Sequence, residues 1–121
     1  MSAAVLLGVG LLGGVGAVAR FLLDGAVSRR SATAFPAGTF AVNVLGALVL
    51  GALVGAAVHD DGYRLAGTGL VGAFTTFSTW TFESHRLAED GQLRIGALNF
   101  VLSLVAGVLA AWAGRQLGAA L

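Results

Sequence analysis

Four long apolar segments are separated by short linkers that hold most of the charged residues. They are residues 3–23, 37–58, 64–86 and 94–118. Each can cross a bilayer as a helix, which takes about 20 apolar residues. Backbone polar groups in lipid must be bonded internally, and these apolar runs are continuous instead of alternating, so helices are expected and a β-barrel is not. The sequence therefore predicts an all-α integral membrane protein, a single four-helix transmembrane domain over residues 1–121.

The overall composition supports a membrane protein over a soluble one. The chain is 57% hydrophobic and 11% charged, whereas soluble domains carry about a quarter charged residues. An Ala/Gly-rich soluble helical protein is the disfavoured alternative. The net charge of +1 supplies no basic field for nucleic acid, and the absence of cysteine excludes disulfides and thiolate metal sites.

The first apolar segment is expected to stay on the mature chain. Ala17-Val18-Ala19 resembles a signal-peptidase site, but no Arg or Lys precedes the apolar run. An even number of spans places both termini on one side of the membrane, with Arg64 and Arg115. The opposite side has a modest excess of arginines, namely Arg29, Arg30, Arg86 and Arg94. Such a weak bias is compatible with insertion in both orientations.

The segment Gly72–Glu83 places five Thr or Ser hydroxyls among four aromatic rings, inside the third apolar segment. Polar residues in a membrane are costly and mark functional sites. Hydroxyls can bond backbone groups that a break in the helix sets free, and the exposed carbonyls are hard ligands for a small cation. Phe77 and Trp80 share a helical face, and an anion can lie against the positive rim of a ring. This pattern predicts a pore or a ligand path.

Other polar residues recur on single faces of the predicted helices. Thr39, Asn43 and Gly46 share one face of the second segment, and Asn99, Ser103 and Gly107 share one face of the fourth. Hydrogen bonds between helices are the alternative role for both faces. Arg20 can attract anions at a pore mouth or extend toward the interface, and Glu83 can be a coupling carboxylate, a vestibule charge or an interfacial residue. No nucleophile–base or metal-ligand set is visible, so an enzyme is not expected.

Three elements of the sequence resemble the CrcB/Fluc family of fluoride channels. Residues 14–21 (GVGAVARF) are similar to its GxxGAxxR element, residues 38–46 (GTFAVNVLG) to GTxxxNxxG, and residues 72–83 (GAFTTFSTWTFE) to the element around FTTFST. The third is highly specific, and the order and spacing of all three fit. The resemblance covers nearly the whole chain, although the fourth segment matches mainly in character.

The resemblance implies a fold and a function. Family members are antiparallel, dual-topology dimers of four-helix subunits in the cell membrane, with the third helix broken. They export fluoride passively and exclude chloride. A structural sodium ion that is not transported lies at the dimer centre, and the resemblance assigns its backbone carbonyls to Gly72 and Thr75. It assigns the fluoride pathway to Asn43, Phe77, Ser78, Thr79 and Trp80, with Arg20 at the vestibule.

One residue departs from the family pattern. Position 80 holds Trp where the family usually has a second Phe. Some members work as pairs of non-identical subunits, so the partner is expected to be either a second copy or a paralogous subunit. Two other functions stay open. A small dual-topology multidrug exporter coupled to protons would want a carboxylate deep in the first segment, where residues 3–19 hold no charge. A non-transporting subunit would use its polar faces only for packing.

Overall fold

The computed structural model describes all of residues 1–121 and contains helices and connecting turns, with no β-strand. Three long helices and a chain of shorter helical segments make up the fold. In order they are α1 (Ala3–Arg30), α2 (Ala37–Gly55), α3 (Asp60–Tyr63), the π-helical segment η1 (Arg64–Val71), α4 (Gly72–Phe74), α5 (Phe77–Glu89) and α6 (Leu93–Ala119). The all-α prediction is confirmed.

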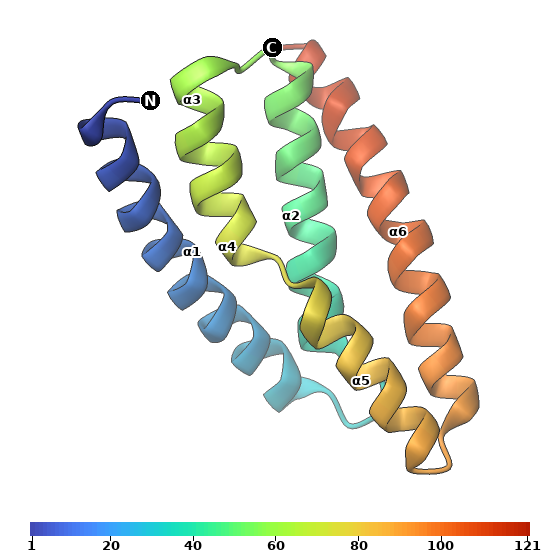
Figure 1. The fold of residues 1–121 in the computed structure, drawn as a ribbon. Helices are drawn as coiled ribbons and strands as arrows, with labels where there is room; N and C mark the ends of the chain where they lie inside the picture. The colour runs from blue at the N-terminus through green and yellow to red at the C-terminus, as the bar shows by residue number, and fades with distance from the viewer.

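The long helices run side by side, with α1 and α6 at opposite edges of the view in Figure 1. The short segments from α3 to α5 follow one another from the end that holds both termini to the opposite end. The most extensive contact joins α2 to α6, while α1 packs on η1 and α5 packs on α6. The two halves of the 64–86 segment therefore contact different long helices.

Glycines bring α2 and α6 unusually close together. A Cβ atom at Gly114 would stand 2.9 Å from the backbone carbon of Leu48 and 3.0 Å from the amide nitrogen of Ala52. Gly51, Gly55 and Gly118 would meet the facing backbone in the same way. Small residues allow such backbone contact between membrane helices. Glycines thus allow direct backbone contact between α2 and α6 within one chain.

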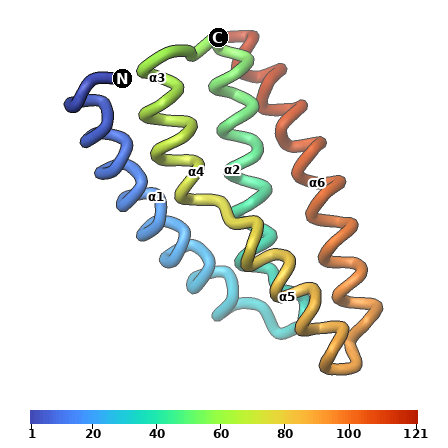
Figure 2. The backbone as a smooth tube through the Cα atoms, viewed as in Figure 1, coloured from blue at the N-terminus to red at the C-terminus, as the bar shows by residue number.

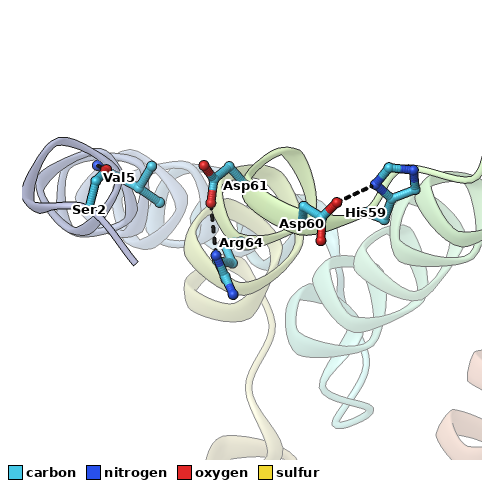
Figure 3. Close-up of polar contacts among 6 residues, drawn as sticks. All are labelled: Ser2, Val5, His59, Asp60, Asp61 and Arg64. Atoms are coloured by element: carbon cyan, nitrogen blue, oxygen red, sulfur yellow. Dashed lines mark hydrogen bonds and ion pairs between the residues drawn. The ribbon is translucent and has the colours of Figure 1, made fainter.

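Charged groups gather at the two ends of the bundle. Near the termini, His59 contacts Asp60 and Arg64 contacts Asp61, both at 2.9 Å, and the Ser2 hydroxyl caps α1 by accepting from the Val5 amide (Figure 3). Exposed pairs of this kind contribute little to stability. These pairs lie at the ends of the bundle, so the apolar middle of the bundle contains no exposed ion pairs. At the opposite end, contacts at 2.7 and 4.0 Å join His85 to Glu89 and Arg86 to Asp90.

The single chain leaves most of its apolar surface uncovered. Only 14 of 121 residues are buried, and the buried hydrophobic residues are Val42 and Val71. Large side chains such as Phe21 on α1 and Trp112 on α6 are exposed. By length and composition, α1, α2 and α6 could each cross a membrane. The 64–86 segment supplies no fourth helix of that length, because it is divided between shorter helices.

Candidate functional site

The helical path is interrupted at Thr75 and Thr76. Helix α4 ends at Phe74, both threonines have extended backbone conformations, and α5 begins at Phe77. Figure 2 shows the chain stepping sideways between α4 and α5. Thr76 is the N-cap of α5, where its Oγ1 accepts a hydrogen bond of 3.2 Å from the Thr79 amide. A β-branched residue with a hydroxyl suits this position, because it favours extended backbone and satisfies an unpaired helical N–H.

Asn43 of α2 holds the interruption from the side. Its Nδ2 donates to the Thr76 carbonyl, and its Oδ1 accepts from the Thr76 amide, both at 2.8 Å. The Asn43 side chain therefore pairs with both the amide and the carbonyl of Thr76, a residue that is not part of a helix. Because an unpaired buried backbone group is costly, Asn43 stabilises the interruption at this residue.

Carbonyls beside the interruption lose their usual helical donors, and those of Gly72 and Thr75 are among them. In a continuous α-helix the Thr76 amide would bond to the Gly72 carbonyl, but it donates to Asn43 instead. The Thr79 amide would bond to the Thr75 carbonyl, but it donates to the Thr76 hydroxyl. Carbonyl oxygens released in this way fit a small hard cation, so Gly72 and Thr75 have the donor chemistry that a sodium ion needs.

Two aromatic rings follow on the first turn of α5. The rings of Phe77 and Trp80 are edge to face, with centroids 5.3 Å apart and planes at 77°. Phe77 is 72% exposed on this single chain, and Trp80 is half-buried. The pair thus places two aromatic rings beside the interruption, with Phe77 at the surface of the single chain.

An open groove of about 420 Å³ lies along this region. Four of the predicted site residues line it, namely Asn43, Thr75, Phe77 and Trp80. Helix α6 adds Ser103 and Gly107, from the second polar face noted in the sequence. No Arg, Lys or His lines the groove. It therefore offers amide, hydroxyl and aromatic groups among mostly hydrophobic side chains, without a fixed positive side chain.

The other predicted residues lie outside the groove lining. Gly72 is exposed, just before the interruption. Ser78 and Thr79 lie on the first turn of α5, and the Thr76 hydroxyl contacts theirs at 3.4 and 3.1 Å. Arg20 stands apart on α1, where its Nε is buried without a hydrogen-bond partner.

Sequence reasoning gave Thr76, Ser84 and Phe100 no individual role. The Thr76–Asn43 pairing joins positions 33 apart and has no local signal. Ser84 had a local signal, because a hydroxyl four residues after Trp80 can bond back to its carbonyl, as it does at 2.9 Å. Phe100 contacts Trp80 from α6, and nothing in the apolar pattern of the fourth segment distinguishes it.

Comparison with known proteins places the chain in a family. Residues 7–115 match the family described as CrcB-like protein, Camphor Resistance (CrcB). This chain belongs to the CrcB family. The resemblance noted in the sequence is therefore confirmed.

Relatives whose names state a function match this CrcB-family chain over nearly all of its length. A "Fluoride-specific ion channel FluC 2" of Mycolicibacterium paratuberculosis is 54% identical over 94% of this chain and 93% of the relative. A protein of the same name from Mycobacterium tuberculosis is 50% identical over 95% and 91%, and one from Cutibacterium acnes is 45% identical over 93% and 96%. These names describe ion channels and not enzymes. With three helices able to cross a bilayer, the chain is a multi-pass protein of the cell membrane.

Proposed function

We propose that this chain forms a fluoride-selective ion channel, which exports fluoride passively and lowers its cytoplasmic concentration. The observation that carries the proposal is the groove at the helix interruption, lined by Asn43, Phe77, Trp80 and Ser103 without a cationic side chain. Fluoride gives up its water only where other donors replace it, and a pore must bind it weakly enough to release it. Amide, hydroxyl and ring-edge donors meet both conditions. The names of the relatives also indicate fluoride as the permeating ion.

The proposed fluoride path follows the groove. Asn43 keeps one amide hydrogen beyond the one that it gives to Thr76, and this hydrogen would donate to the ion. The edges of Phe77 and Trp80 would face the ion next. Ser78 and Thr79 would continue the polar track on α5, and Arg20 would raise the local anion concentration at the vestibule.

The proposed assembly is an antiparallel dimer in which two chains insert in opposite orientations. The third membrane span of each chain would consist of the two helical halves on either side of Thr75 and Thr76. Three features support a dimer: the groove is open on the single chain, the bundle buries few residues, and the arginine bias is weak. The partner would be a second copy or a paralogous subunit.

A structural sodium ion fits the same assembly. The carbonyls of Gly72 and Thr75, which lack their helical donors, would hold it near the dimer centre. Such an ion would supply a fixed positive charge that favours anions in the interior and stabilises the interrupted helices.

Fluoride efflux from proteoliposomes containing only this chain tests the proposal. We expect rapid efflux of fluoride with little chloride efflux, no dependence on an imposed proton gradient, and weaker efflux when sodium is removed during reconstitution. Efflux that requires a proton gradient would indicate the exporter alternative. An inactive chain that conducts only after a paralogous subunit is added would show a heterodimer.

Replacement of Trp80 by Phe is expected to keep fluoride efflux at or above the wild-type rate. Phenylalanine retains a ring edge at this position, and it is the residue that the family usually has. The indole N–H that would be lost donates to the Asn99 carbonyl at 3.3 Å and so is not free for the ion. Initial efflux rates at matched protein density measure the effect. Loss of efflux from a correctly assembled Trp80→Phe variant would show that the indole is required.

A further inference from the structure

The indole of Trp80 contacts three groups, which come from two helices. The ring of Phe77, also on α5, lies in an edge-to-face arrangement with the ring of Trp80. On α6, the Phe100 ring stacks against it at 4.8 Å and 16°, and the Asn99 carbonyl accepts its indole N–H. Phe100 and Asn99 do not line the groove, whereas Trp80 does. Phe100 would therefore act on a permeating ion through Trp80, and Asn99 would act through Trp80 or through Ser103, which also lines the groove.

A chain of buried and partly buried hydrogen bonds connects the backbone of Trp80 to Asn99. The Ser84 hydroxyl donates to the Trp80 carbonyl at 2.9 Å, and Asn99 Nδ2 donates to the Ser84 oxygen at 2.8 Å. Asn99 is fully buried, and its Oδ1 accepts from the Ser103 hydroxyl at 3.3 Å. The indole of Trp80 is thus bonded to Asn99 directly, and the backbone carbonyl of Trp80 is bonded to Asn99 through Ser84.

We infer that Phe100 and Asn99 are positioning residues, which hold the Trp80 ring so that its C–H edge, and not its N–H, faces the ion path. This inference rests on the proposed function. The indole N–H has a partner already, and the stacked Phe100 ring restricts rotation of the indole about its side-chain bonds. What remains for an anion is the positive rim of the ring, the same type of contact that Phe77 offers.

Phe100→Leu tests the inference because it removes the ring and keeps an apolar side chain. A Trp112→Phe parent leaves Trp80 as the only tryptophan, since the chain contains two. We expect the Trp80 emission maximum to move to longer wavelength and acrylamide quenching to increase. Fluoride efflux should fall roughly two- to tenfold, the factor equivalent to one aromatic pair, with lower selectivity over chloride.

Two variants serve as controls. Phe100→Tyr retains the ring and should keep both the emission and the efflux of the parent. Phe82→Leu removes an exposed ring from α5 that has no aromatic partner, and it should change neither. Phe100→Met, which also lacks a ring, repeats the test if the leucine variant does not assemble.

The outcomes separate the inference from the proposed function. Unchanged Trp80 emission in an assembled Phe100→Leu variant would overturn the inference, because Phe100 would not be holding the indole. A shifted emission with unchanged efflux and selectivity would also overturn it. If the Trp112→Phe parent conducts no fluoride, the proposed function is overturned, and a positioning role in permeation with it. Comparing the Trp80 emission of this parent and of its Phe100→Leu variant would still report whether Phe100 holds the ring.

Discussion

Replacement of Asn43 by alanine is expected to lower fluoride efflux at least about 30-fold. The change leaves the amide and the carbonyl of Thr76 without partners, where Asn43 pairs both at 2.8 Å. Each unpaired buried group costs about 1–3 kcal/mol, so the two together disfavour the interrupted backbone by about 2 kcal/mol or more. The proposed fluoride donor is lost in the same step. Efflux from proteoliposomes at matched protein density measures the result.

Leu50→Ala is the matched control for this prediction. Leu50 lies on the same helix and lines the same groove, and its truncation removes no hydrogen bond. We expect its efflux to stay within a few-fold of the wild type, and both variants should elute as the wild-type assembly. Wild-type efflux from Asn43→Ala would contradict the prediction. It would instead favour the view that the polar faces only pack helices together.

The Gly114→Ala substitution is expected to destabilise the fold by about 1–3 kcal/mol, the usual cost of inserting a methyl group into a filled space. The new Cβ would stand 2.9 Å from the Leu48 carbonyl carbon and 3.0 Å from the Ala52 nitrogen. Both atoms belong to the backbone of α2, so neither can move as a side chain would. The helices must separate, and the contact between α2 and α6 is the most extensive in the chain. Thermal or denaturant unfolding in detergent measures the loss.

Gly10→Ala provides the comparison at another glycine within a helix. A Cβ at Gly10 meets nothing within 4 Å. Since alanine favours helix over glycine by about 1 kcal/mol in water, this variant should be neutral or slightly stabilised. Equal stability of the two variants would show that close contact at Gly114 does not limit the packing of α2 against α6.

Several parts of the fold followed from local sequence. Continuous apolar runs predicted helices in the regions of α1, α2 and α6, because a helix bonds its own backbone groups. The first of these helices continues to Arg30, beyond the predicted end of the span at residue 23. The hydroxyls within residues 72–83 indicated that a helix in this region could break, since such side chains can bond the freed backbone groups, but they did not locate the interruption at Thr75 and Thr76. The rings of Phe77 and Trp80 were expected on one face from their spacing alone.

The partners of these residues could not be predicted, because they are distant in sequence. Asn43 could have bonded to any facing helix, and only the packing of α2 beside the interruption pairs it with Thr76. Similarly, GxxxG spacing occurs at Gly10, at Gly51 and at Gly114, but only the last two lie at a close helix contact. The indole N–H of Trp80 likewise donates to the Asn99 carbonyl, 19 positions away along the chain.

Local sequence was enough to predict a helical, apolar chain in which hydroxyls and aromatic rings are concentrated at residues 72–83. Hydropathy and residue spacing are local properties, so they can be evaluated along the chain. The contacts between helices were needed to show that Asn43 bonds to both backbone groups of Thr76, that Gly72 and Thr75 lose their helical donors, and that the indole N–H of Trp80 donates to Asn99. Those outcomes depend on which backbone groups find partners across helices, and such pairing is settled only when the helices pack.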